Sequence, residues 1–242
     1  MTSLAFPGRK RPLKGQVYSL ANNMNPPQFQ VFECTNPACR LRFPNDLSVR
    51  QITTCPHCHA KMEPVGNPYS NFQHAAETSG NFTGKISLLL DNLRSAENVG
   101  SILRTADGAG VAHVYCCGTT PIPLHPRVHK ASLHAEESIP WSYHPNGLLL
   151  AAELISNGSF LVGVESTMAS HSLFKTHPED WRQSDLVLVY GNEISGIDPQ
   201  ILEICQFQLH IPMSGVKSSL NVAVSAGITI YWLLGSFHGY PQ

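Results

Sequence analysis

The sequence lacks a hydrophobic run long enough to cross a membrane. No charge-free apolar stretch reaches about 18 residues, and the apolar tail from Leu220 to Leu234 is too short and too rich in small residues. A secretory signal is also missing, because the charges of MTSLAFPGRKRPLKGQ follow its few apolar residues instead of preceding them. These absences argue against a membrane protein and predict a cytoplasmic location.

The sequence also lacks a strong net charge and a dinucleotide-binding glycine motif. The formal net charge is −1 at pH 7, which predicts neither strong attraction to nucleic acid nor repulsion from it. No Gly-x-Gly-x-x-Gly follows the first strand of the C-terminal part, where only Gly100 stands.

Basic residues cluster near the start, at Arg9, Lys10, Arg11 and Lys14. We expect residues 1–29 to form a basic, flexible segment in which a local patch can bind phosphates.

Four of the seven cysteines are spaced like metal ligands. The pattern is Cys-x4-Cys, fifteen residues, then Cys-x2-Cys, at Cys34, Cys39, Cys55 and Cys58. Thiolates bind Zn²⁺ tetrahedrally, and two knuckles brought together by a hairpin supply four sulfurs. In a reducing cytoplasm disulfides are the weaker explanation. The first knuckle is longer than usual, so His57 or His59 stays open as a ligand in place of one cysteine.

These cysteines predict a zinc ribbon at residues 30–63, with Phe32, Leu41 and Phe43 as a minimal core. A module this small buries little surface, so metal binding would supply much of its folding energy. Ribbons bind nucleic acid or partner proteins, and the fold alone does not decide between them. Residues 64–84 are polar and rich in proline and glycine, which predicts a linker.

Beyond the linker the sequence alternates strands and helices. Ile86–Asp91 and residues 112–118 are short apolar runs typical of buried strands. The residues between them keep helical spacing at Val99, Ile102, Leu103 and Ala106. Strand, helix and strand with short links form a βαβ unit, and hence a parallel sheet.

The remaining segments continue the same alternation. Further strands are predicted at Phe160–Val164 and Leu186–Tyr190, and a helix at Gly147–Ser156. The last helix is expected to start near Leu220, with Ser219 as its N-cap. The fold class is therefore α/β with a parallel sheet.

Polar residues follow several of these strands. GNEISGID comes directly after Tyr190, at the carboxyl edge where open α/β sheets bind ligands. Gly191 lets a backbone come close to a ligand, and Glu193 offers an acceptor or a base. The loop before the last helix places free N–H groups where a polar or anionic ligand can bind.

Three segments taken together resemble a known family. NVGSILRTADGAG, LVYGNEISGID and IPMSGVKSSLNVAVSAG are similar to the three motifs of the SpoU (TrmH-like) RNA 2′-O-ribose methyltransferases of the SPOUT superfamily. Order and approximate spacing agree, and the resemblance covers about Lys85 to Phe237. KASLHAEES adds a fourth similarity, although His134 stands where glycine is more usual. Ala223 stands where the family commonly has serine.

The resemblance implies a SPOUT-type knotted parallel sheet for residues 85–242, with a deep C-terminal trefoil knot. It implies S-adenosylmethionine bound in a bent form within the knotted loops, and an RNA substrate, either tRNA or rRNA. It also implies a homodimer whose site is completed near the subunit interface. The cofactor-binding residues that it implies are Gly191, Ile211, Met213, Ser219 and Leu220.

The catalytic residues that the resemblance implies are Asn98, Arg104, Glu193, Ser219 and Asn221. Arg104 is the residue that the family nominates for activating the ribose hydroxyl. Because arginine is effectively never deprotonated in proteins, Arg104 suits a phosphate clamp that orients the nucleotide and stabilises alkoxide charge. The proton would then leave to phosphate, water or Glu193.

Two other functions remain open at this level. One is a non-catalytic RNA-binding protein in which the zinc ribbon is the working part. The intact set Asn98, Arg104, Glu193 and Asn221 argues against it. The other is a SPOUT enzyme that methylates a base nitrogen, whereas the motif pattern favours ribose.

Overall fold

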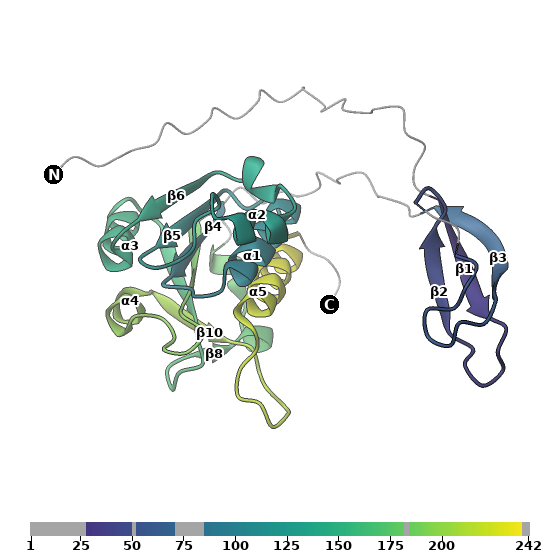
Figure 1. The fold of residues 1–242 in the computed structure, drawn as a ribbon. Helices are drawn as coiled ribbons and strands as arrows, with labels where there is room; N and C mark the ends of the chain where they lie inside the picture. The colour runs from purple at the N-terminus through teal and green to yellow at the C-terminus, as the bar shows by residue number, and fades with distance from the viewer. Residues whose placement is uncertain (1–27, 50–51, 71–84, 182–183, 239–242) are drawn as a thin grey trace. The chain divides into compact units, whose positions relative to one another are not determined.

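The computed structural model describes residues 28–49, 52–70, 85–181 and 184–238 (Figure 1). The chain divides into two compact units, Met1–Thr78 and Ser79–Gln242. All but the last two residues of the predicted basic segment 1–29 lie outside the described ranges. Within those ranges, no helix combines the length and hydropathy that a membrane crossing requires.

The N-terminal unit is built on a small antiparallel sheet. Its strands β1 (Gln28–Cys34), β2 (Arg42–Asp46) and β3 (Met62–Ser70) lie in the order β2-β1-β3. The buried core consists of Phe32, Cys34, Cys55 and Met62. Leu41 and Phe43 pack against it half-buried, so the three predicted core residues lie together.

The prediction of a linker at residues 64–84 is wrong for its first part. Residues 64–70 belong to β3 and pair with β1, which itself begins at Gln28, before the predicted ribbon boundary. Pro64 and Pro68 suggest a linker, yet proline is tolerated on an edge strand, and β3 is one. The rest of the predicted linker, residues 71–84, lies outside the described ranges.

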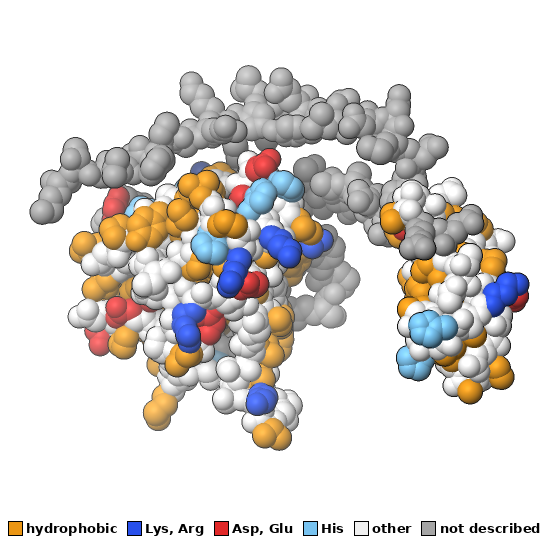
Figure 2. All heavy atoms as spheres, viewed as in Figure 1, with side chains coloured by type: hydrophobic (Ala, Val, Ile, Leu, Met, Phe, Trp, Pro, Cys, Tyr) orange, Lys and Arg blue, Asp and Glu red, His pale blue; other side chains and the backbone are white. Residues whose placement is uncertain are grey.

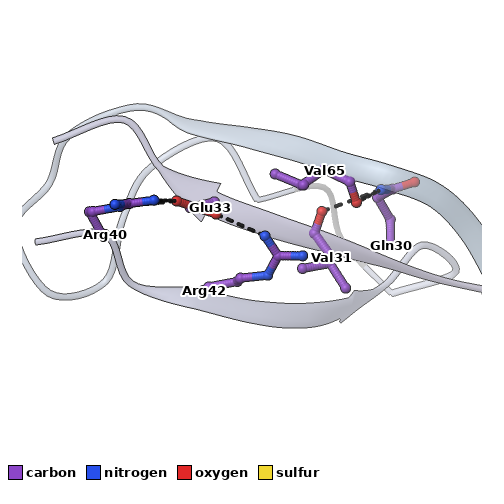
Figure 3. A network of polar contacts seen from close by, with 6 residues as sticks. All are labelled: Gln30, Val31, Glu33, Arg40, Arg42 and Val65. Atoms are coloured by element: carbon purple, nitrogen blue, oxygen red, sulfur yellow. Dashed lines mark hydrogen bonds and ion pairs between the residues drawn. The ribbon is translucent and has the colours of Figure 1, made fainter. Parts of the chain in front are cut away.

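A buried glutamine holds the irregular part of this edge strand. The register between β1 and β3 shifts between Phe29 and Val31, and Gly66 has a φ of +73° at this point. Gln30 Nε2 donates to the carbonyl oxygen of Val65 at 2.9 Å (Figure 3), and also to that of Gly66 at 3.1 Å. A polar side chain thereby satisfies carbonyls that the bulge removes from the ladder.

Two of the basic residues in this unit are paired with an acid. Arg42 Nη1 lies 2.9 Å from Glu33 Oε2, and Arg40 Nη2 lies 3.3 Å from Glu33 Oε1 (Figure 3). The hydrogen bonds from Arg42 and Arg40 lower the pKa of Glu33. The two guanidinium groups therefore share one carboxylate, which partly neutralises their positive charge.

The C-terminal unit contains a seven-stranded sheet whose neighbouring strands are all parallel, in the order β6-β5-β4-β9-β7-β10-β8. This confirms the α/β prediction and the βαβ unit at its start. The strands are β4 (Ile86–Asp91), β5 (His113–Cys117), β6 (Trp141–His144), β7 (Phe160–Val164), β8 (His171–Ser172), β9 (Leu186–Tyr190) and β10 (Phe207–His210).

Helices cover both faces of this sheet (Figure 1). One face carries α1 (Ala96–Gly108), α2 (Pro126–Ser132) and α5 (Val222–His238), and the other carries α3 (Gly147–Ser156) and α4 (Pro199–Ile204). The short helices are η1 (Ala135–Glu137), η2 (Leu173–Lys175) and η3 (Pro178–Trp181). In β4, Leu88 and Leu90 enter the core beneath α1 while Leu89 enters the opposite one, as the two-residue period of a strand requires.

The last helix begins later than predicted, and its cap is Asn221 instead of Ser219. Asn221 Oδ1 accepts from the N–H of Ala223 at 2.9 Å, and its carbonyl accepts from Ser225 at 2.9 Å. Ser219 and Leu220 lie in the exposed loop before the helix. Serine and asparagine are comparable N-caps, so composition alone could not choose between them.

His113 predicts a pH dependence of stability. Burial, followed by the charge of His144, lowers the pKa of His113 from its ordinary value of 6.5 to about 4. Below pH 6.5 His113 takes up a proton in the unfolded chain, whereas in the folded chain it does so only near pH 4. His113 therefore does not reduce the free energy of unfolding above pH 6.5, and it reduces that free energy progressively as the pH falls towards 4.

Urea unfolding followed by tryptophan fluorescence tests this, because the three tryptophans all lie in the C-terminal unit. A His113→Gln variant should lose less stability than the wild type between pH 7.5 and about 5. The matched control is His177→Gln, a change at an exposed histidine. An unchanged slope in His113→Gln would contradict the assignment.

Candidate functional site

The site lies where β4 and β9, neighbours in the sheet, reach their carboxyl ends. After β4 the chain turns through Asn92, whose φ is +54°, and enters α1 at Ser95. The Ser95 hydroxyl caps α1 by accepting from the N–H of Asn98 at 3.1 Å. Asn98 therefore occupies the first turn of α1, with its side chain at the mouth of the sheet.

The segment after β9 forms a closed turn. Asn192 and Gly196 exchange two backbone hydrogen bonds, of 3.0 and 2.9 Å. Gly191 is buried beneath this turn, and a Cβ there would collide with the backbone of Gly196 and Ile197. A glycine is needed at Gly191 because the chain crosses itself closely at this point.

A chain of hydrogen bonds connects three of the predicted site residues. Asn98 Nδ2 donates to Glu193 Oε1 at 2.9 Å, and Asn221 Nδ2 donates to Asn98 Oδ1 at 2.9 Å. We call Glu193, Asn98 and Asn221 the polar triad. Each comes from a different motif of the sequence, and Asn98 and Asn221 are 123 positions apart.

Glu193 is held as an ionised acceptor. Besides the Asn98 amide, it accepts from the N–H of Arg94 at 2.8 Å and from the N–H of Ser95 at 3.1 Å. Burial raises the pKa of Glu193, but the hydrogen bonds outweigh burial and the net pKa is lowered. A carboxylate that is already satisfied by three donors is better suited to organising the loop before α1 than to accepting a proton.

The structure leaves two predicted catalytic residues outside the triad. Arg104 is exposed on α1, and Ser219 is exposed in the loop before α5. Among the described residues, neither side chain has a hydrogen-bond or ion-pair partner. Side chains of Lys and Arg are spread over the face that carries α1 and α2 (Figure 2). The exposed cations that these two helices and the preceding loop contribute are Arg94, Arg104, Arg127 and Lys130.

The predicted cofactor residues lie on two segments. Gly191 is buried in the turn after β9, whereas Ile211 is half-buried at the end of β10. Met213 and Leu220 are both 36% exposed. Of the backbone hydrogen bonds outside helices and strands in the described ranges, none involves residues 212–220. Exposed apolar side chains next to free backbone donors and acceptors fit a cofactor held between apolar groups and backbone contacts.

Sequence reasoning missed three polar residues that support this site. Asn192 Nδ2 donates to the carbonyl of Asn92 at 2.7 Å, which ties the β9 turn to the β4 turn. Asp91 Oδ2 accepts from the N–H of Asp198 at 3.1 Å, and Glu165 Oε2 accepts from Ile197 at 3.2 Å. Asp91, Asn192 and Glu165 all sit at or just past the end of a strand. The feature of the sequence that could have identified these residues is their position at the end of, or just after, an apolar run.

The four predicted zinc ligands converge in the N-terminal unit. The Sγ atoms of Cys34, Cys39, Cys55 and Cys58 all lie within 4.8 Å of one another. Cys34 and Cys58 Sγ are 3.4 Å apart, and Cys39 and Cys55 Sγ are 3.9 Å apart. Four thiolates at about 2.3 Å from one Zn²⁺ have sulfurs roughly 3.8 Å apart, so the cluster fits the ion. His57 Nδ1 lies 3.4 Å from Cys39 Sγ, so His57 is near enough to the cluster to stay open as an alternative ligand.

Comparison with known proteins assigns the C-terminal unit to a protein family. The SpoU rRNA Methylase family matches residues 85–231. The chain belongs to this family. The matched range contains the whole polar triad, Arg104 and the loop before α5, so the family resemblance covers the site described above.

Individual members of the family are related at moderate identity. The Bacillus subtilis (strain 168) protein YacO, assigned to the TrmH family of tRNA/rRNA methyltransferases, is 34% identical over 148 residues, which is 60% of this chain and 56% of YacO. This chain thus spans little more than half the length of the first curated relatives it matches.

Solved structures share the fold. One from Porphyromonas gingivalis, assigned to RNA methyltransferases of the TrmH family, is 31% identical, with a TM-score of 0.55 over 65% of this chain and 61% of that one. Another, described as giving insight into 2-OH methylation of C/U34 on tRNA, is 26% identical, with a TM-score of 0.54 over 65% of this chain and 99% of that one.

Proposed function

We propose that this protein is an S-adenosylmethionine-dependent RNA methyltransferase that modifies a ribose 2′-hydroxyl in tRNA or rRNA. The observation that carries the proposal is the polar triad, in which Glu193, Asn98 and Asn221 link three distant motifs at the carboxyl ends of β4 and β9. A network of this kind fixes side-chain orientation before the substrate arrives, which is how enzymes preorganise a site.

Arg104 is proposed to bind and orient the RNA. It is exposed on the same helix as Asn98, and among the described residues no carboxylate pairs with it. An unpaired guanidinium can clamp a phosphate or stabilise developing charge on the 2′-oxygen, but it cannot serve as a base. Because three hydrogen bonds engage Glu193 and its lowered pKa makes it a weaker base, the proton is proposed to leave to phosphate or water.

S-adenosylmethionine would be held by Gly191, Ile211, Met213, Ser219 and Leu220. When bound, it supplies an electrophilic methyl group on a sulfonium. The exposed apolar side chains of Met213 and Leu220, together with the free backbone groups of residues 212–220, support this assignment. The proposal includes a trefoil knot formed by the last segments of residues 85–242.

The proposed assembly is a homodimer. Helix α5 carries no charged residue between Val222 and Phe237, yet Val224 is 50% exposed and Tyr231 is 53% exposed. A helix that is apolar on all sides is normally buried, and a second copy of the chain would cover this face.

Residues 28–70 are proposed to be a zinc ribbon on Cys34, Cys39, Cys55 and Cys58 that helps to bind RNA. The proposed place of action is the cytoplasm. The main alternative is an enzyme of this fold that methylates a base nitrogen. The 26% identical structure, which is described as concerning 2-OH methylation on tRNA, favours the ribose.

Methyl transfer from labelled S-adenosylmethionine to undermodified RNA tests the proposal through Arg104. Removing one preorganised positive group should lower turnover by about 10²–10³-fold in Arg104→Ala, with cofactor affinity unchanged. Arg104→Lys should recover only part of the activity, because lysine lacks the two-pronged geometry.

Lys175→Ala is the matched control, since it removes one exposed positive charge elsewhere in the same unit. Near wild-type turnover in Arg104→Lys would count against the two-pronged contact. Equal losses in Arg104→Ala and Lys175→Ala would show that Arg104 contributes only general charge.

A further inference from the structure

We propose a second metal site, on His129, His134 and Glu136, that binds a divalent transition-metal ion such as Zn²⁺. One ring nitrogen of each histidine and one carboxylate oxygen of Glu136 all lie within 4.8 Å of one another. Two imidazoles and a carboxylate form a recognised zinc ligand set that leaves a fourth position to water. Ligands of one Zn²⁺ have their atoms roughly 3.3–3.6 Å apart, so small side-chain rotations would complete the site.

Neighbouring groups orient two of these three ligands, Glu136 and His134. Glu136 accepts a hydrogen bond from the hydroxyl of Ser132, which is fully buried. Glu136 also contacts His129 Nδ1, which brings two proposed ligands together, and an ion bound between these atoms would replace that contact. His134 Nδ1 lies 3.2 Å from Glu137 Oε1. Donation from Nδ1 to Glu137 leaves Nε2 of His134 with the free lone pair, which is the usual carboxylate–histidine–metal arrangement.

The backbone takes an unfavourable conformation to bring the histidines together. Leu133 and His134 follow α2 with φ values of +52° and +70°, both in the left-handed region. The conformation costs on the order of 1–2 kcal/mol for a residue other than glycine. Neither side chain is buried in return, because Leu133 is 59% exposed and the His134 side chain is 67% exposed. The turn places the His134 ring edge to face with the His129 ring, and the ring centroids are 4.7 Å apart.

The site would fix the end of α2 against α1. A Cβ on Gly100 of α1 would lie 2.5 Å from Ala131 Cβ of α2, so the two helices already cross closely. Ser138, just after η1, donates to Asp107 Oδ1 of α1 at 2.6 Å. An ion on His129, His134 and Glu136 would join α2 to η1 and close this packing from outside. Figure 2 shows pale blue histidine side chains beside a red carboxylate on the face over α2.

Calorimetric titration of the full-length protein with Zn²⁺ tests the site through His134→Gly. Glycine adopts the left-handed backbone without strain, so this variant removes a ligand while the fold is retained. The wild type should bind one more Zn²⁺ per chain than His134→Gly, and this difference counts the proposed site whatever the four cysteines hold. The matched control His177→Ala, at an exposed histidine, should bind as the wild type does.

A graded variant adds a second readout. Ser132→Ala keeps all three ligands but removes the hydroxyl that orients Glu136, and should weaken the additional binding by about 10–100-fold. Zn²⁺ should also raise the Tm of the wild type more than that of His134→Gly. Equal stoichiometry in the wild type and His134→Gly would overturn the proposal, and so would an equal Zn²⁺-dependent change in Tm.

Discussion

An Asn98→Ala enzyme is expected to lose about 10²–10³-fold in methyl transfer, the effect of removing one preorganised donor from an active site. The Asn98 amide both donates to Glu193 and accepts from Asn221, so alanine breaks both links of the polar triad. The free energy of unfolding should change by no more than about 1–2 kcal/mol, because the bonds are partly exposed and Glu193 keeps its backbone donors.

The matched control is Asn157→Ala, which truncates an exposed asparagine at the end of α3. It should leave turnover unchanged. A double variant sharpens the test: if Asn98 and Asn221 act as one unit, Asn98→Ala and Asn221→Ala together should lose little more than Asn98→Ala alone. Independent, multiplicative losses would show that the hydrogen bond between them has no role in turnover.

Removal of zinc is expected to unfold residues 28–70 while the C-terminal unit stays folded. Among the described residues of the small unit, the buried core is limited to Phe32, Cys34, Cys55 and Met62, and two of these are themselves proposed ligands. Structural zinc in isolated fingers supplies about 10–16 kcal/mol at pH 7, far more than so few apolar side chains contribute. Amide hydrogen exchange should therefore lose its protection in β1, β2 and β3 after chelation, and also in Cys55→Ser.

Cys205→Ser is the control for this experiment. Cys205 is a free, half-buried cysteine of the C-terminal unit, and it lies outside the four-cysteine cluster. Exchange in residues 28–70 should be the same in Cys205→Ser as in the wild type. Protection that persists in β1–β3 after all metal has been stripped would contradict the assignment of zinc as the source of stability.

Local periodicity was sufficient for the elements that position the site. Ile86–Asp91, Phe160–Val164 and Leu186–Tyr190 are strands as predicted, and Gly147–Ser156 is a helix, because each combines an apolar pattern with clear ends. The order of the strands within the sheet could not be predicted from local periodicity. β9 lies between β4 and β7 in the sheet, although four strands (β5 to β8) and three α-helices (α1 to α3) separate it from β4 in the sequence.

The errors arose where tertiary structure decides between locally equivalent choices. β3 contains two prolines and a glycine, yet the free edge of the sheet and the Gln30 side chain accommodate them. Asn221 instead of Ser219 caps α5, because the first helical hydrogen bond falls there. The structure joins Asn98, Glu193 and Asn221, three of the five residues that the family pattern implied, but the pattern could not show that Glu193 is engaged by two backbone N–H groups.

The most direct test of the proposed function is alkaline hydrolysis of RNA that the wild-type protein has methylated with labelled S-adenosylmethionine. A methyl group on the 2′-oxygen blocks attack on the adjacent phosphate, so the label should appear in alkali-resistant dinucleotides. Label that appears instead in mononucleotides would contradict ribose methylation and identify a base as the acceptor.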